Sequence, residues 1–82
     1  MSIQEFCGEI EKIYNARIIY YAEYDQIEIN FDIVHIDIKL IYDGEQIRST
    51  DFDNMILIIE DDIWRAENKL KGRKYREINN DN

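Results

Sequence analysis

Apolar and polar residues alternate between Ile27 and Leu40, and no other feature of the chain restricts its fold so strongly. Side chains of a β-strand point alternately to the two faces, so this pattern predicts a strand with one buried face. The alternation slips by one residue at Ile33-Val34, where no proline, glycine or Asn-Gly pair marks a turn. A slip without a turn signal is typical of a β-bulge. We therefore predict one long, bent strand over residues 27–42.

Two further strands are predicted beside this one. Residues 17–24 are rich in isoleucine and tyrosine, which favour strands, and residues 25–26 are placed to close a tight turn. The Asp-Gly pair at 43–44 is the strongest hairpin signal in the chain. It predicts a short returning strand over residues 45–48, with Leu40 opposite Ile47.

The turn at 25–26 also fixes a pairing register. On the inner face it pairs Tyr24 with Ile27, Ala22 with Ile29, Tyr20 with Phe31 and Ile18 with Ile33. On the outer face it places Glu23 opposite Glu28, Ile19 opposite Asp32 and Tyr21 beside Asn30. All the inner residues are apolar, so the local pattern and the turn position agree.

An amphipathic helix is predicted at each end of the strands. Ser2 and Glu5 form a capping box at the start of the first helix. The apolar stripe of this helix is Ile3, Phe6, Cys7, Ile10, Ile13 and Tyr14. The last helix begins beside the possible caps Ser49, Thr50 and Asp51, and we expect it to end at Gly72. Its apolar stripe is Phe52, Met55, Ile56, Ile59, Ile63, Ala66 and Leu70, with Trp64 expected as a partly buried residue at the edge.

These elements predict a single α+β domain over residues 1–72, followed by a flexible polar tail over residues 73–82. The expected architecture is a two-layer sandwich in the order α-β-β-β-α. Its three-stranded antiparallel sheet has a long bent central strand, and both helices cover one face. The other sheet face is left open to solvent.

The charge is unevenly distributed along the chain. Residues 1–62 hold fifteen acidic and four basic residues, a net charge of −11, whereas residues 63–82 have a net charge of +3. Such a body repels nucleic acid and anionic membranes and attracts basic protein surfaces.

The composition also bears on where the protein works. A single cysteine, Cys7, excludes an internal disulfide, and no apolar run approaches the about 20 residues that cross a bilayer. We expect a cytoplasmic protein. The abundance of isoleucine, tyrosine, asparagine and lysine is typical of AT-rich coding sequence, such as that of a low-GC bacterium or its phage, and a phage protein would work in the host cytoplasm.

A set of carboxylates is the candidate binding site. It is predicted to combine the outer sheet face with the last helix, and it comprises Glu23, Glu28, Asp32, Asp37, Glu60, Asp61 and Asp62, together with Tyr21. Spaced carboxylates can imitate the phosphate backbone that a nucleic-acid-binding protein recognises. The alternative is an ordinary solvated face that keeps the protein soluble.

Catalytic and metal-binding patterns are weak by comparison. Asp32 followed by Asp37-Ile38-Lys39 has the residue types of a Mg²⁺-dependent nuclease, but chance matches are common in an acidic chain. One histidine, His35, and one cysteine cannot supply the four ligands of a zinc site. Cys7 lies on an apolar stripe, where a buried and inert thiol is expected. We therefore expect no enzymatic activity, no cofactor and no metal.

The basic C-terminal stretch has three interpretations. Its bases, interleaved with Trp64 and Tyr75, have the composition of a nucleic-acid-binding segment, although the acidic body opposes that function. They also complement the negative end of the helix dipole. A third interpretation is a contact with the acidic body of a second copy, so a homo-oligomer stays open.

Together these features predict a non-enzymatic acidic protein that blocks a basic, nucleic-acid-binding surface of a larger protein, with no direct contact to nucleic acid or membrane. A phage or mobile-element inhibitor of a defence enzyme, such as an anti-CRISPR or DNA-mimic protein, is the specific form of this hypothesis. An immunity or antitoxin-like protein that neutralises a basic toxin has the same electrostatics. A small self-associating regulatory protein is the third hypothesis.

Overall fold

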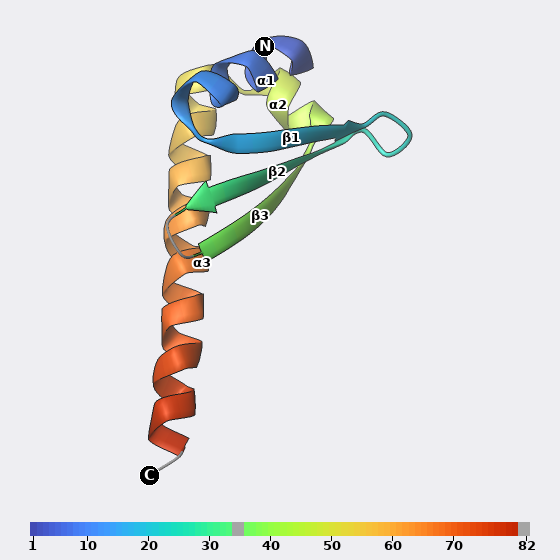
Figure 1. Cartoon of the computed structure of the whole chain (residues 1–82). Coiled ribbons are helices and arrows are strands. Elements are labelled where there is room, and N and C mark those ends of the chain that lie inside the picture. Colours follow the sequence, from blue (N-terminus) through green and yellow to red (C-terminus); the bar gives the residue numbers. More distant parts are fainter. Residues whose placement is uncertain (34–35, 81–82) are drawn as a thin grey trace.

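The computed structural model describes the backbone of residues 1–33 and 36–80, and the side chains of residues 1–32 and 37–69. The elements follow one another as α1 (Ile3–Ile13), β1 (Ala16–Tyr21), β2 (Gln26–Ile33), β3 (Ile36–Asp43), α2 (Gly44–Ser49) and α3 (Phe52–Asn80), as Figure 1 shows. The predicted α+β class and α-β-β-β-α order are confirmed, with the short helix α2 added before the last helix.

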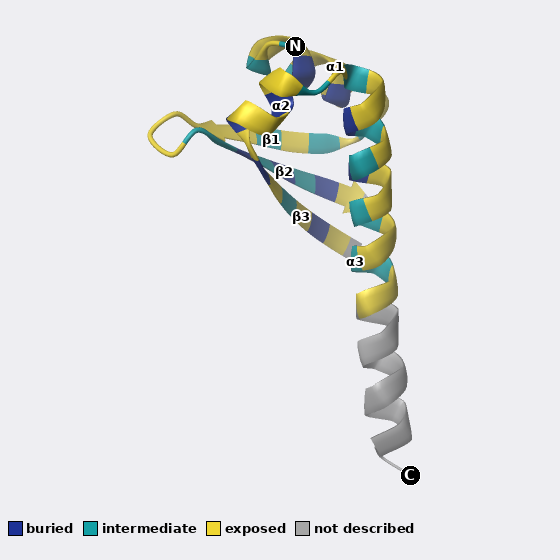
Figure 2. Ribbon diagram, turned by 180° about the vertical axis from the view of Figure 1, so that it is seen from behind, coloured by how far each residue is buried: buried dark blue, intermediate teal, exposed yellow. Residues whose placement is uncertain are grey.

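Two layers make up the fold. The strands form an antiparallel sheet in the order β1-β2-β3, so each strand pairs with its neighbour in the chain. Helices α1 and α3 lie on one side of this sheet (Figures 1 and 2). The predicted sandwich with both helices on one face is therefore confirmed.

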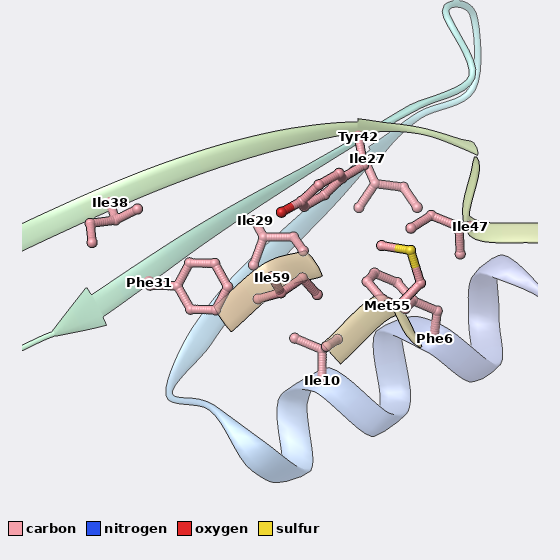
Figure 3. Packing of buried hydrophobic residues seen from close by; sticks show 10 residues of the cluster. All are labelled: Phe6, Ile10, Ile27, Ile29, Phe31, Ile38, Tyr42, Ile47, Met55 and Ile59. Atoms are coloured by element: carbon pink, nitrogen blue, oxygen red, sulfur yellow. The ribbon is translucent and has the colours of Figure 1, made fainter. Parts of the chain in front are cut away.

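The core lies between the inner sheet face and the two long helices. Ile27 and Ile29 of β2 have no exposed surface, and neither have Ile10 of α1 and Ile59 of α3. The complete set of buried apolar residues is Phe6, Ile10, Ile27, Ile29, Phe31, Ile38, Tyr42, Ile47, Met55 and Ile59 (Figure 3). The alternation of β2 and the stripes of both helices thus identified most of this core.

The long bent strand predicted over residues 27–42 is wrong. The chain reverses direction there, because Ile33 of β2 pairs with Ile36 of β3 and Asp32 pairs with Asp37. In such a hairpin the paired residues share a face, so the inner positions change from odd to even numbers without a bulge. Val34, at which the bulge was predicted, and His35 lie outside the described residues.

The turn between β1 and β2 also differs from its prediction. It occupies residues 22–25 rather than 25–26, so Tyr20 pairs with Ile27 and Ile18 pairs with Ile29. The register is therefore shifted by four residues on β1. An even shift keeps every side chain on its predicted face, because strand side chains alternate with a period of two.

Asp25 explains why the turn closes early. Its φ of 49° lies in the left-handed region, which aspartate tolerates better than most residues. Its carboxylate accepts hydrogen bonds from the Tyr20 hydroxyl, at 2.8 Å, and from both terminal nitrogens of Arg48. The turn is thus attached to α2, a contact between distant residues that the local sequence pattern does not contain.

The strand predicted over residues 45–48 is helix α2, so the hairpin at Asp43-Gly44 and the pairing of Leu40 with Ile47 are wrong. Gly44 has no positive φ, which a tight hairpin turn of this type requires. Instead its N–H donates to the Asp25 carbonyl at 2.7 Å, and a Cβ at this position would overlap the Asp25 carboxylate. The helix turns Ile47 into the core, where it is fully buried.

The starts of the long helices match their predicted caps. Glu5 N–H donates to the Ser2 hydroxyl at 3.0 Å, and Asn54 N–H donates to the Asp51 carboxylate at 2.8 Å. Helix α3 continues past Gly72 to Asn80, so the end predicted at Gly72 is wrong. A helix-interior glycine is only about 1 kcal/mol less favourable than alanine, and such a penalty does not force a stop. The division into a domain and a flexible tail stays a prediction.

No helix in the described part of the chain combines the length and the apolar character that crossing a membrane requires.

Truncation of Ile59 tests whether the core between the layers dominates stability. We expect Ile59→Ala to lower the free energy of unfolding by about 2–5 kcal/mol, because it leaves a cavity among fully buried neighbours. Leu57→Ala is the matched control on the same helix, since Leu57 is 63% exposed and its loss changes stability little. Urea unfolding followed by circular dichroism measures both. Similar midpoints for the two variants would contradict this account of the core.

Candidate functional site

The outer sheet face carries charges of both signs. Its cross-strand rows are Tyr21–Gln26–Asp43, Ile19–Glu28–Ile41 and Arg17–Asn30–Lys39, followed by the pair Asp32–Asp37. The predicted pairs Glu23–Glu28, Ile19–Asp32 and Tyr21–Asn30 are therefore wrong, as a consequence of the four-residue shift. Acidic residues outnumber basic ones on this face, but two cations lie among them.

Glu28, at the centre of the face, is largely neutralised. Its carboxylate accepts a hydrogen bond from the Asn30 amide at 3.1 Å and lies 3.5 Å from the Lys39 ammonium. The Asn30 hydrogen bond and then the Lys39 charge hold the pKa of Glu28 below its usual value. Its side chain is only 13% exposed, so Glu28 is poorly placed to contact a partner.

Asp32 and Asp37 form the most prominent acidic feature of the face. They lie directly opposite each other at the end of the β2–β3 hairpin, and both are exposed. Neither makes an ion pair with any residue whose side chain is described. Directly opposed like charges destabilise a sheet by something below about 1 kcal/mol. This arrangement thus opposes folding slightly and presents two adjacent negative charges to solvent.

The nuclease-like pattern is brought together only in part. Asp32 and Asp37 are adjacent, but the Lys39 ammonium is directed to Glu28. Among the described residues, no group of three or more histidine, cysteine, aspartate or glutamate side chains is arranged to hold a metal ion. His35 lies outside the described residues. The expectation of a non-enzymatic protein stays a prediction.

A second acidic group lies at the opposite end of the strands. Glu23 is in the β1–β2 turn, and an open hollow beside this turn is lined by Tyr24, Asp25, Asp43, Glu45, Gln46 and Ser49. Tyr24 is 71% exposed. Asp43 and Glu45 are not among the predicted site residues, because the sequence pattern around them predicts a hairpin, whereas α2 brings them beside the turn.

The three acidic residues of α3 that were predicted as part of the site do not join the set on the outer face. Asp62 accepts a hydrogen bond from the hydroxyl of Tyr42, an inner-face residue of β3, at 2.6 Å. Asp61 pairs with Arg65 on the same helix at 3.0 Å. Glu60 faces Tyr14, whose pKa is raised first by burial and then by this carboxylate. Because α3 covers the inner face, the sheet and helix carboxylates point to different sides of the molecule.

Two other predicted candidates are resolved by their exposure. Trp64 is 63% exposed, so its prediction as a partly buried residue is wrong. It lies seven residues after the equally exposed Leu57, on the same face of α3.

Cys7 is half-buried. Burial, and then the charge of Glu11, raise the pKa of its thiol, which disfavours the reactive thiolate. Of the basic C-terminal residues, only Arg65 and Lys69 have described side chains.

The balance between acidic residues and ion pairs is the most general property of the surface. Residues 1–69 contain sixteen acidic residues, whereas four carboxylates form ion pairs, those of Glu9, Asp25, Glu28 and Asp61. No charged side chain in the described part is buried. Most of the negative charge of residues 1–69 is therefore exposed, and it has no counter-ion within ion-pair distance among the described side chains.

The contact between Tyr42 and Asp62 contributes to the free energy of unfolding at neutral pH, and this contribution is expected to decrease at alkaline pH. Burial, and then the Asp62 carboxylate, raise the pKa of Tyr42 well above the value of about 10 for a free tyrosine. A raised folded-state pKa stabilises the fold fully below pH of about 10, and this contribution is lost as pH rises further. We expect Tyr42→Phe to lower the free energy of unfolding by about 1 kcal/mol at pH 7. This deficit should shrink above pH 10.

Urea unfolding of the native chain and Tyr42→Phe between pH 7 and 11 measures the difference. Tyr14 and Tyr20, whose pKa values are also raised, are present in both proteins, so the difference reports Tyr42 together with its coupling to Tyr14, which contributes to the raised pKa of Tyr42. A deficit that stays constant across this range would show that Tyr42 does not hold its proton more tightly in the folded state.

Comparison with protein-family models, curated proteins and solved structures gives no match to this chain. Its function is therefore inferred from charge, exposure and geometry alone.

Proposed function

We propose that the protein is a non-enzymatic inhibitor that occupies a basic, nucleic-acid-binding surface of a larger protein. The observation that supports this most directly is the exposed pair Asp32 and Asp37, two opposed carboxylates without a described cationic partner. A basic partner that supplies arginine or lysine to this pair relieves their repulsion when it binds. Charge-assisted contacts of this kind are stronger than neutral hydrogen bonds.

The second acidic group extends the surface. Asp37 and Asp43 are the outer-face carboxylates at the two ends of β3, separated by six residues, or about 20 Å at the strand rise. Exposed tyrosines lie near the Asp43 end, at 41% exposure for Tyr21 and 71% for Tyr24. Tyrosine supplies apolar contact area and stacks on arginine, so it strengthens binding to a basic protein surface.

A more specific form of the proposal is a phage-borne inhibitor of a nucleic-acid-targeting defence enzyme that works in the host cytoplasm. The net charge of −8 favours fast, salt-sensitive association with such a target and disfavours direct binding to nucleic acid.

Affinity capture followed by competition tests this function. The tagged protein is incubated with host lysate at low and at moderate salt, and captured proteins are then purified and assayed for nucleic-acid binding. We expect at least one basic captured protein to lose its nucleic acid when the acidic protein is added. If every captured protein keeps its nucleic acid under these conditions, the inhibitor proposal is wrong.

Charge reversal locates the surface. We expect Asp32→Lys/Asp37→Lys to weaken the competition by about tenfold or more, since each lost charge-assisted contact contributes about 1.5–3 kcal/mol. Glu5→Lys/Glu11→Lys on α1 is the matched control, because it changes the net charge equally at two exposed positions on the helical side of the fold. Equal loss in both variants would mean that net charge, rather than the sheet surface, determines binding.

A further inference from the structure

The outer edge of β3 is unpaired in the described sheet. β3 has β2 on one side and no strand on the other. The Asp32 N–H of β2 donates to the Asn15 carbonyl, which lies on the side of β1. Successive residues of a strand direct their backbone N–H and C=O groups to opposite sides, so those of the preceding residue, Phe31, point toward β3. Phe31 pairs with Ile38, and the backbone groups of Ile38, Leu40 and Tyr42 therefore face β2. Those of Asp37, Lys39, Ile41 and Asp43 face outward.

The side chains on this edge follow an order that can pair with the same edge of a second copy. The same four residues point to the outer sheet face, and all are exposed; Ile41 is exposed to 58%. Their order is negative, positive, apolar and negative. In an antiparallel pairing centred on Ile41, each Lys39 faces Asp43 of the other copy and Ile41 faces Ile41. Opposite charges and apolar side chains placed directly across strands stabilise a sheet.

The charges also discriminate between registers. A two-residue slip that centres the pairing on Leu40 opposes Asp37 to Asp43 twice, and a further slip opposes Lys39 to Lys39. Directly opposed like charges are unfavourable. A pairing centred on Ile38 joins Asp37 to Lys39 but leaves Ile41 without an Ile41 partner. Lys39 already lies 3.5 Å from the Glu28 carboxylate, and the pairing centred on Ile41 adds Asp43 of the other copy as a second carboxylate. No other of these registers covers the exposed isoleucine with its own copy.

We propose that two copies of this chain associate through antiparallel β3–β3 pairing centred on Ile41, which forms a continuous six-stranded sheet. Asp32 and Asp37 are not paired across this interface, whereas Asp43 belongs both to the interface and to the second acidic group. The inference does not depend on the proposed function.

The symmetry of this pairing also fixes the relative direction of the two α3 helices. The two-fold axis of such a pairing is perpendicular to the sheet, so the α3 helices of the two copies run antiparallel. α3 continues past β3 in Figure 1. Residues 52–64 of this helix hold Asp53, Glu60, Asp61 and Asp62 and no base, whereas residues 65–80 hold six basic residues, from Arg65 to Arg76, and two acidic residues, Glu67 and Glu77. The order of acidic then basic residues therefore runs in opposite directions along the two helices, so that a contact between them would oppose unlike charges.

Charge-swap variants test the interface and its register together. Sedimentation equilibrium of the native chain should show a mass that rises from 10.0 kDa toward twice that value with increasing concentration. We expect Lys39→Glu and Asp43→Lys each to raise the dimer dissociation constant by about tenfold or more, because each places two pairs of like charges across the interface. An equimolar mixture of the two variants restores opposite charges at both positions, and it should dimerise as tightly as the native chain.

The mixture also shows that both variants are folded, since an unfolded chain cannot restore the dimer. Asp37→Lys is the matched control: it makes the same charge change on the same strand and should leave the dissociation constant within about threefold of the native value. Loss of dimer in Asp37→Lys but not in Asp43→Lys would overturn this register in favour of pairing centred on Ile38. A native chain that stays at 10.0 kDa up to about 1 mM would overturn the proposal.

Discussion

Burial of a single sheet face under two helices is the constraint on which the rest of this small fold depends. Ile27 and Ile29 of the central strand have no exposed surface, and they are covered by residues of α1 and α3 from opposite ends of the chain. An 82-residue chain buries a smaller share of its surface than a larger domain, so it has too few apolar residues to cover the second face of the sheet as well. The outer sheet face is consequently left for charge and for contacts with other molecules.

The attachment of the β1–β2 turn to α2 determines what that outer face presents. Asp25 connects the turn to Arg48, and the Gly44 N–H donates to its backbone carbonyl. This junction sets the end of β3 and the start of α2, and it therefore places Asp43 and Glu45 beside Tyr24. Because the guanidinium and the Tyr20 hydroxyl hold the pKa of Asp25 below its usual value, the junction keeps its charge over the neutral pH range.

The sequence was sufficient for properties that depend on local periodicity. Most of the α1 and α3 stripes, the cap at Ser2 and the inner face of β2 were predicted correctly, since each follows from a pattern within one element. Ile13 of the predicted α1 stripe is an exception, because it is 52% exposed, and Leu70 lies outside the residues with described side chains. The strand boundaries were not. A hairpin at 33–36 and a bulge at 33–34 produce the same shift in alternation, and the partner strand that distinguishes them is a tertiary contact. Likewise, the role of Gly44 depends on Asp25, nineteen residues earlier in the chain.

The candidate site was predictable in composition but not in arrangement. Asp32 and Asp37 were identified and lie together, whereas Glu28 is neutralised and Asp62 is held by Tyr42. A count of carboxylates contains no information on which of them meet a cation or a hydroxyl. Those contacts follow from strand register and helix rotation, and a register error of four residues was enough to change every outer-face pair.

The agreement between strand order and chain order has a consequence for how the molecule folds. β1, β2 and β3 are consecutive and joined by short connections, so the whole sheet forms with little loss of loop entropy. The contact that closes a long loop is the packing of α1 with α3. In the chain, their core residues Ile10 and Ile59 are separated by all three strands and α2. Such proteins fold fast through their local contacts. We expect the docking of the two terminal helices to be the slow step, with the hairpins already formed before it.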